Sequence, residues 1–312
     1  MMPFTFRHLE PDADLSRLAK LQAEVEAADQ DGRDVSPTRL REQMAIPGHD
    51  AVQDCWVVEP ADDPEHIIAF CGVWKATNDD HADISGIVHP QWRRKGIGRI
   101  LLSRILVRAR NLGARQVDAY VNAQNKPGNA FLHEHSFLPV SAYTLMRADN
   151  TVQFEMPVWP AGFTVRSFDA VLDVSVLVKA MNDSYDGLWG HNPITEEEIG
   201  RQLKERAAEG IFLAFDAGGE VAGVSSAEMS RKLSAQRGEP TGRLDAPGVI
   251  PWRRRHGLYL PLLLTGVHYL LAQQPAAIEL ESWGDDDRVL AEYEQAGFTV
   301  VRRSVPYRLN LR

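Results

Sequence analysis

The stretch HPQWRRKGIGRILLSRIL, which begins at His89, places three cations and two glycines directly before an apolar repeat. The cations can pair with an anion, and the glycines leave the backbone open to a ligand. The apolar residues have helical spacing, so the glycines fall at a helix N-terminus, where the first amides lack intrahelical partners and the helix dipole favours negative charge. The stretch therefore predicts a diphosphate-binding turn.

Two common phosphate-binding motifs are absent from this stretch. A Walker loop requires G-x-x-x-x-G-K-[ST], and a Rossmann fingerprint requires G-x-G-x-x-G inside a βαβ unit. The alternative to an anion site is structural, with the glycines serving a tight turn between a strand and a surface helix.

The chain repeats itself at an offset near 160 residues. FTFRHLEP at Phe4 resembles FTVRSFDA at Phe163, and the basic stretch superposes on IPWRRRHGLYL, so that Pro90 matches Pro251. Two further pairs occur in the same order, which indicates duplication. Prolines interrupt the seam TVQFEMPVWPAG. Because single cores stop growing at roughly 250 residues, we expect two domains, at residues 1–157 and 158–312.

Each half has the same predicted order of elements. A strand leads into two helices, at residues 14–28 and from Ser36 in the first half, and at 171–185 and from Thr195 in the second. A meander of strands follows, then the glycine helix, a strand, a short helix and a last pair of strands. This order predicts two α+β domains, each a mostly antiparallel mixed sheet flanked by helices.

The composition narrows the class of protein. The net charge of −9 and the pI near 5.6 argue against nucleic-acid and anionic-membrane partners, which need a surplus of cations. Cys55 and Cys71 lie among strand-like residues and are expected to be buried and free of disulfides. The start lacks the apolar core of a signal peptide, and no segment is apolar enough to span a membrane, so a cytoplasmic protein is expected.

The order strand, V-x-P-x-x-R-x-x-G-x-G, long helix, strand, Asn, short helix and Phe strand resembles the GNAT superfamily of acyl-CoA-dependent acyltransferases. VHPQWRRKGIG and VNAQNKPGNAFLHEHSF carry this resemblance in the first half, and it is weaker in the second. The whole chain resembles a tandem member of the family. The resemblance implies acetyl-CoA as cofactor, no metal, and N-acetylation of a small amine by direct attack on the thioester.

The resemblance also implies which residues bind the cofactor. The turn would hold the pyrophosphate through Arg93, Arg94, Lys95, Gly96, Ile97, Gly98 and Arg99. The backbone of Ile87 and Val88 would pair with the pantetheine arm, and Asn125 would contact the same arm.

The residues for proton transfer depart from the family pattern. The family base position is Ala82 here. The candidates are therefore the flanking His81 and Asp83, the nearby Asp80, or a water that they hold. Strand alternation places both on the face opposite Ala82, unless a bulge intervenes; the alternative is a solvated turn. The family acid position is Leu132, and the nearby histidines His133 and His135 are expected to be exposed.

The second half keeps Tyr293 at the acid position, where it is a catalytic candidate, a relic or ordinary packing. Tyr259 stands where Gly98 should be, and Asp286 stands in place of Asn125. Asp285 to Asp287 are expected to cap the next helix. We expect cofactor binding in the first half only and an acceptor pocket shaped by the second, with Trp189, His191 and Glu228 as candidates. The alternatives are catalysis in the second half and a non-catalytic CoA sensor. The amine and the oligomeric state stay open.

Overall fold

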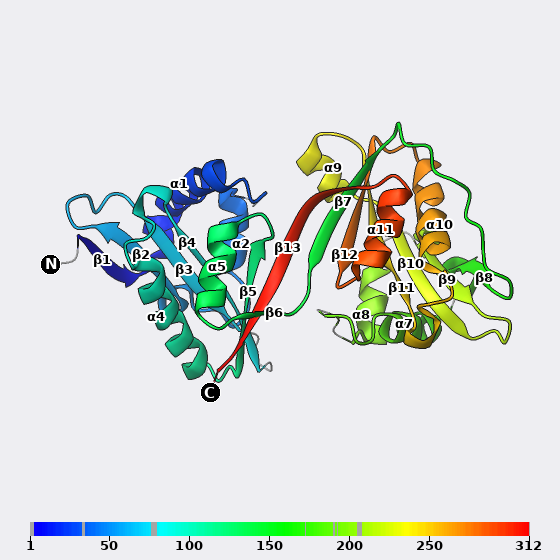
Figure 1. Ribbon diagram of the computed structural model, residues 1–312, viewed down its shortest axis with the longest axis horizontal. Coiled ribbons are helices and arrows are strands. Elements are labelled where there is room, and N and C mark those ends of the chain that lie inside the picture. Colours follow the sequence, from blue (N-terminus) through cyan, green and yellow to red (C-terminus); the bar gives the residue numbers. More distant parts are fainter. Residues whose placement is uncertain are drawn as a thin grey trace. The chain divides into compact units, whose positions relative to one another are not determined.

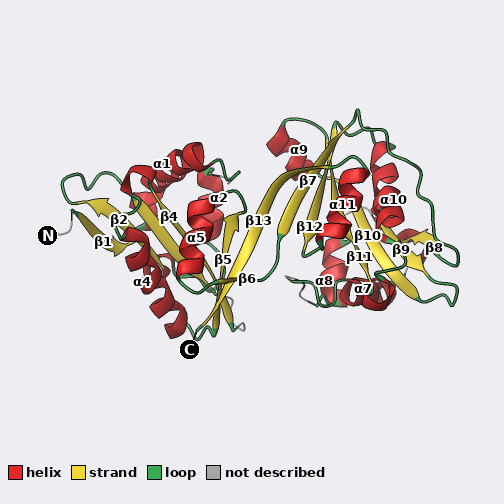
Figure 2. Ribbon diagram, in the orientation of Figure 1, coloured by secondary structure: helices red, strands yellow, loops and turns green. Residues whose placement is uncertain are grey.

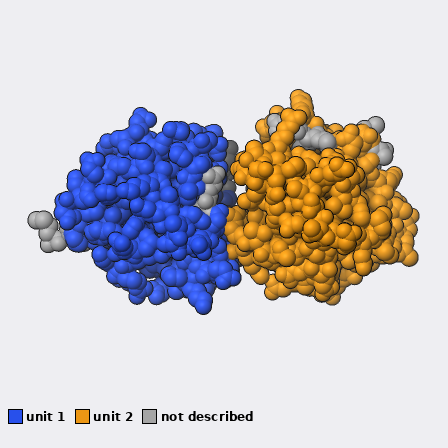
Figure 3. All heavy atoms as spheres, turned by 90° about the horizontal axis from the view of Figure 1, so that it is seen from above, with its two compact units in different colours: residues 1–140, 304–312 blue, residues 141–303 orange. Residues whose placement is uncertain are grey.

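The structure is a computed structural model that describes residues 3–32, 35–75, 80–171, 173–189, 191, 193–204 and 208–311. It divides into two compact units, which are coloured separately in Figure 3. Unit 1 comprises residues 1–140 and 304–312, and unit 2 comprises residues 141–303. Over the described residues, no helix combines the length and the apolar character needed to cross a membrane.

Unit 1 is a mixed sheet with the strand order β1-β2-β3-β4-β5-β13 (Figure 1). The strands are β1 (Phe4–His8), β2 (Cys55–Pro60), β3 (Ala69–Trp74), β4 (His81–Val88), β5 (Gln116–Asn122) and the end of β13 (Thr299–Asn310), which also pairs with β6 (Leu138–Pro139). The β4·β5 pair is parallel, and the other pairs of this order are antiparallel. The helices are α1 (Pro11–Asp29), α2 (Pro37–Met44), α3 (Ala51–Asp54), α4 (Ile97–Asn111) and α5 (Lys126–Glu134), with a 3-10 turn η1 at Pro90–Trp92.

Both faces of this sheet are covered by helices (Figure 2). Leu101 and Ile105 of α4 pack on Ala82 and Val117, whereas α1 packs on Phe70 and Ile87 from the opposite face. Alternation along β4 therefore separates Ala82 and Ile87 into different cores. Full burial of one large apolar side chain contributes about 1.5–3 kcal/mol to the free energy of folding. The helices therefore hold β4 firmly in position.

Unit 2 repeats the plan of unit 1. Its strand order is β7 (Tyr143–Asp149), β12 (Ala277–Trp283), β11 (Thr241–Val249), β10 (Val221–Met229), β9 (Ile211–Phe215) and β8 (Thr164–Ser167), with β11·β12 parallel. The helices are α6 (Phe168–Val171), α7 (Val174–Ser184), α8 (Glu196–Gln202), α9 (Arg231–Arg237), α10 (Tyr259–Leu271) and α11 (Asp287–Gln295), with 3-10 turns η2 (Ala208–Gly210) and η3 (Pro251–Arg253).

The predicted fold class is confirmed in both units: mostly antiparallel mixed sheets carry helices on their faces. The predicted helix starts are also confirmed. Ser36 caps α2 by accepting from the amide of Arg39, and Thr195 forms a full capping box with Glu198. Helix α9 was not predicted, because the sequence RKLSAQR lacks an apolar stripe.

The last strand of each unit comes from the other half of the sequence. Residues 304–310 of β13 pair antiparallel with β5, from Ser304 opposite Asn122 to Asn310 opposite Gln116 (Figure 1, red strand). Strand β7, from the first half, pairs with β12 in unit 2. The compact units consequently divide at residues 140 and 303. The boundary near residue 158 stays a proposal about the duplicated sequence.

Candidate active site

Strands β4 and β5 separate before they end. Their parallel pairing runs from His81 opposite Gln116 to Ile84 opposite Ala119, although β4 continues to Val88. On its other edge β4 stays paired with β3 as far as Val88. The edge of β4 from Ser85 to Val88 therefore faces a gap, where its peptide groups can pair with an extended, amide-bearing ligand as they would with a strand.

A cleft of about 550 Å³ occupies this gap. Apolar side chains such as Leu101, Ile105 and Phe131 form part of its wall. Of the residues predicted to bind a cofactor, the following line it: Ile87, Val88, Arg93, Arg94, Gly96, Ile97, Gly98, Arg99 and Asn125. Lys95 does not line this cleft, because its ammonium lies over the ring of Trp92, 4.2 Å from the centroid.

The turn between η1 and α4 presents bare amides. Arg94 and Gly96 have left-handed backbones, with φ of 64° and 83°, and α4 begins directly after them at Ile97. Within the described part of the chain, no hydrogen bond is donated by the backbone amides of residues 94–99. Free N–H groups at a helix start are an arrangement that can bind an anion such as a diphosphate.

Two side chains predicted to be cofactor ligands already have protein partners. Arg93 donates Nε to the carbonyl of Val88 at 3.0 Å, and its two Nη atoms donate to both carboxylate oxygens of Asp29 at 2.8 and 2.7 Å. Asn125 is the N-cap of α5: its Oδ1 accepts from the amide of Gly128 at 2.9 Å, and its Nδ2 donates to Asp31 at 3.3 Å.

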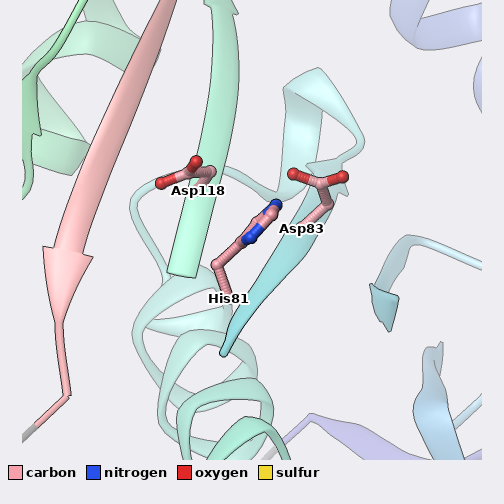
Figure 4. A group of neighbouring side chains, drawn as sticks. All are labelled: His81, Asp83 and Asp118. Carbon is pink, nitrogen blue, oxygen red and sulfur yellow. The ribbon is translucent and has the colours of Figure 1, made fainter. Parts of the chain in front are cut away.

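A polar cluster lies where β4 and β5 are still paired. Figure 4 shows the imidazole of His81 between the carboxyl groups of Asp83 and Asp118. Their nearest ligand-type atoms all lie within 4.8 Å of one another. The β4·β5 register is continuous from His81 to Ile84, so His81 and Asp83 are on the face opposite Ala82, which is buried. Arg308 donates to both oxygens of Asp118, at 2.8 and 2.7 Å. That carboxylate is therefore neutralised within the chain and not free for a metal.

Tyr120 joins this cluster to the cleft. It is two residues beyond Asp118 on the same face of β5, it lines the cleft, and its side chain is 42% exposed. Burial raises the pKa of its phenol, and the nearby carboxylates of Asp83 and Asp118 raise this pKa further. Tyr120 was missed by the sequence reading, although its two-residue spacing from Asp118 was visible.

The short helix α5 offers no proton donor at the family position. Leu132 is buried in the core. His133 is exposed, as predicted, with Nε2 3.3 Å from the hydroxyl of Tyr307. The prediction was wrong for His135, which is partly buried, lines the cleft and holds Nδ1 2.8 Å from the carbonyl of Phe131.

Unit 2 has the same strand separation, but side chains fill it. The β11·β12 pairing ends at Asp245 opposite Glu281, while β11 continues to Val249. The ring of Tyr185 packs on Gly248, where a Cβ would lie 2.9 Å from its Cζ, and its hydroxyl donates to the carbonyl of Ala246 at 2.9 Å. Sequence reasoning missed Tyr185 because nothing in a helix end signals where its ring points.

The other second-half candidates are also placed. Tyr259 and Tyr293 are both buried, and among the described atoms the Tyr293 hydroxyl has no hydrogen-bond partner. Burial raises the pKa of nearby Asp285 to about 6, although a hydrogen bond from Ser282 opposes this. Asp286 caps α11, as predicted, by accepting from Val289.

The three acceptor-pocket candidates contact their own unit. Trp189 stacks on Trp283, His191 lies beside Tyr185, and Glu228 pairs with Arg243.

A second arrangement in unit 1 has the residue types of a nucleophile with its base. Cys55 Sγ lies 3.6 Å from His49 Nε2, and His49 Nδ1 lies 3.3 Å from a carboxylate oxygen of Asp54. The thiol is fully buried, and this burial raises its pKa, so the reactive thiolate is suppressed. Cys71 is buried against the opposite core, so the two thiols face away from each other.

We therefore expect neither cysteine to react with 5,5′-dithiobis(2-nitrobenzoic acid) at pH 8 in the folded protein. Absorbance at 412 nm should rise only after denaturation, when both thiols regain ordinary pKa values. Rapid labelling of Cys55 in the native chain would instead identify the Cys55, His49 and Asp54 group as a reactive site.

Comparison with known proteins agrees with this geometry. Residues 19–137 match the model of the acetyltransferase (GNAT) family. This segment is therefore similar to GNAT acetyltransferases, and the fold of the whole chain is similar to that of a tandem GNAT protein. Among solved structures, a GCN5-related N-acetyltransferase from Sphaerobacter thermophilus covers all of this chain and 97% of its own, with a TM-score of 0.73 at 23% identity. A tandem GNAT protein from the clavulanic acid biosynthesis pathway covers 99% of both chains, with a TM-score of 0.61 at 19% identity.

Similar curated proteins include mycothiol acetyltransferases. The mycothiol acetyltransferase of Gordonia bronchialis is 28% identical over 75% of this chain and 76% of its own length. That of Tsukamurella paurometabola is 25% identical over 95% of this chain and 97% of its own. These similarities extend beyond the segment that matches the family model, into unit 2.

Proposed function

We propose that the protein transfers the acetyl group of acetyl-CoA to the amine of a small molecule, and that the reaction takes place at the cleft of unit 1. One observation carries this proposal: the separation of β4 and β5 opens beside a turn whose amides have no partner in the described chain. A diphosphate joined to an extended, amide-bearing arm satisfies both features together. The acetyltransferase names of the relatives support a small-molecule acceptor.

The residues of unit 1 divide the work of binding. The amides of residues 94–99 would hold the pyrophosphate, with the cations Arg94 and Arg99 at the rim of the cleft. The free edge of β4 at Ile87 and Val88 would pair with the pantetheine amides. The apolar wall of the cleft excludes water from the arm. Acetyl-CoA itself supplies the activated thioester that an amine can attack.

The polar cluster would prepare the amine. An alkylamine has a pKa near 10 and arrives protonated, so it must lose a proton before attack. The carboxylate of Asp83 would attract the ammonium group, and the imidazole of His81 lies beside it to take the proton, directly or through water. The departing thiolate has a pKa near 8.5, so the lack of an acid at Leu132 slows the reaction less than it would for an alkoxide.

A second candidate places catalysis in unit 2. It is favoured by the buried hydroxyl of Tyr293, which has no hydrogen-bond partner among the described atoms and lies near Asp285. Against it, Tyr185 fills the unit 2 gap, and Tyr259 occupies the position that glycine holds in unit 1. The first half would then hold a structural cofactor.

Release of the CoA thiol, measured with a panel of amines, tests these possibilities. If unit 1 is catalytic, Asp83→Asn combined with His81→Ala should lower kcat by about 10²-fold or more, the usual contribution of acid–base groups, whereas Tyr293→Phe should leave kcat unchanged. The reverse pattern would move catalysis to unit 2. Acetyl-CoA binding without turnover for any amine would identify a sensor and contradict the proposal.

A further inference from the structure

We infer that residues 29–31, at the end of α1, form a bracket that holds the two lips of the cleft at a fixed width. Arg93 and Asn125 act through this bracket as positioning residues and are not direct ligands of the cofactor. The inference rests on the proposed function, because it describes how the unit 1 cleft is kept ready for acetyl-CoA. It gives a new role to Arg93 and Asn125, which the resemblance to the family assigned as cofactor ligands.

The bracket holds the β4 lip through Arg93. The guanidinium engages three acceptor atoms at once: the carbonyl of Val88, where β4 ends, and both oxygens of Asp29, where α1 ends. A planar fork with paired hydrogen bonds of this kind fixes geometry as well as charge. Asp29 and Val25 of α1 also line the cleft. The arginine thus connects one wall of the cleft to the turn at its mouth.

The bracket holds the β5 lip through Asp31, which is 5% exposed. Its carboxylate accepts from Nδ2 of Asn125 at 3.3 Å, and its backbone carbonyl accepts from Nδ2 of Asn122 at 3.4 Å. Asn122 is the last residue of β5, and Asn125 begins α5. Asp29, through Arg93, and Asp31 therefore reach both strands at the end where the strands no longer pair with each other.

Unit 2 offers an internal comparison. Arg254 corresponds to Arg93. It donates Nε to the carbonyl of Val249, where β11 ends, just as Arg93 donates to Val88, where β4 ends, and both distances are 3.0 Å. Its Nη2 donates to the carbonyls of Ser184 and Asp186, at 3.3 and 2.6 Å, at the end of α7. Because Tyr185 fills the gap in unit 2, this arginine keeps its contacts where no arm can enter. A positioning role explains the hydrogen bonds of both arginines, whereas a phosphate-binding role explains neither set of bonds.

The two roles of Arg93 predict opposite signs for a change at Asp29. If Arg93 were a phosphate ligand, loss of the Asp29 negative charge would release the guanidinium and favour the polyanionic cofactor. If Arg93 is a positioning residue, Asp29→Asn loosens the cleft and weakens binding, although it removes a negative charge from the neighbourhood. We expect a loss of about tenfold in acetyl-CoA affinity, which is about the worth of one hydrogen bond to a charged group.

Isothermal titration of acetyl-CoA into the full chain tests this, with Asp29→Asn, Arg93→Lys and the double variant. We expect each single change to weaken binding about tenfold and the double variant to be little worse than either, because the two residues act as one unit. The salt dependence of the affinity should stay that of the wild type, since no phosphate contact is lost. The matched control is Glu24→Gln on the same helix, whose contacts to Lys20 and His89 are long, at 4.0 and 3.6 Å.

Tighter or unchanged binding by Asp29→Asn, with weaker and less salt-dependent binding by Arg93→Lys, would overturn the inference and make Arg93 a phosphate ligand. A readout without cofactor separates this outcome from failure of the proposed function. In the cofactor-free chain, Asp29→Asn should speed amide hydrogen exchange in residues 85–98 and 119–125, whereas Glu24→Gln should not. Unchanged exchange there contradicts the bracket, whether or not the wild-type chain binds acetyl-CoA.

Discussion

Replacing Gly98 with tryptophan should abolish acetyl-CoA binding. Gly98 lies at the cleft wall in the first turn of α4, and a Cβ there would already lie 3.4 Å from the ring of Phe131. The rest of an indole must therefore extend into the cleft, where the arm and the diphosphate are expected. We expect a loss of more than about a hundredfold in affinity, or roughly 2.7 kcal/mol, by isothermal titration.

Two controls accompany this variant. Gly200→Trp makes the same replacement in α8, where a Cβ at Gly200 meets nothing within 4 Å, and it should leave affinity unchanged. Tyr259→Gly restores the family glycine in unit 2, but Tyr185 still fills the gap, so no second binding event should appear. Full acetyl-CoA affinity in Gly98→Trp would move the cofactor away from the unit 1 cleft.

Removing the guanidinium of Arg308 should strongly destabilise unit 1. Asp118 is 1% exposed, and Arg308 donates to both of its oxygens. Arg308→Leu leaves that carboxylate buried without its partner, a change that typically costs about 3–5 kcal/mol. We expect the free energy of unfolding to fall by about 3 kcal/mol, measured by urea denaturation.

A same-strand control separates this effect from a general loss of charge. Arg303→Leu, also on β13, breaks a pair with Asp287 whose side chains are 42% and 84% exposed, and it should cost less than about 1 kcal/mol. Adding Asp118→Leu to Arg308→Leu should restore much of the loss, because no buried charge is left alone. Equal stability of the two single variants would show that β13 contributes little through Asp118.

The order of elements and the glycine turn before α4 could be predicted because their signals are local. Apolar spacing defined α4, and Gly96 adopts the positive φ that favours glycine before a helix. The faces of His81 and Ala82 followed from alternation, since no bulge interrupts the β4·β5 register. The catalytic and ligand roles assigned to individual residues stay predictions, because spacing alone cannot test chemistry.

The missed features depend on partners that are distant in the sequence. The partner of Arg93 is Asp29, 64 residues away, and the motif gave no sign that its side chain was already engaged. The ring that fills the unit 2 gap comes from Tyr185, at a helix end with no pattern of its own. The exchange of last strands was invisible because the sequence of a strand does not reveal which strand lies alongside it.

The exchanged strand also orders events on the ribosome. Unit 1 lacks its last strand until residues 304–310 have been synthesised. By then the ribosome has already synthesised all of unit 2. At about 5–20 residues per second, the nascent first unit waits roughly ten to thirty seconds with the edge of β5 uncovered. An open strand edge can pair with other chains, so the yield of soluble protein should depend on chaperones during this interval of translation.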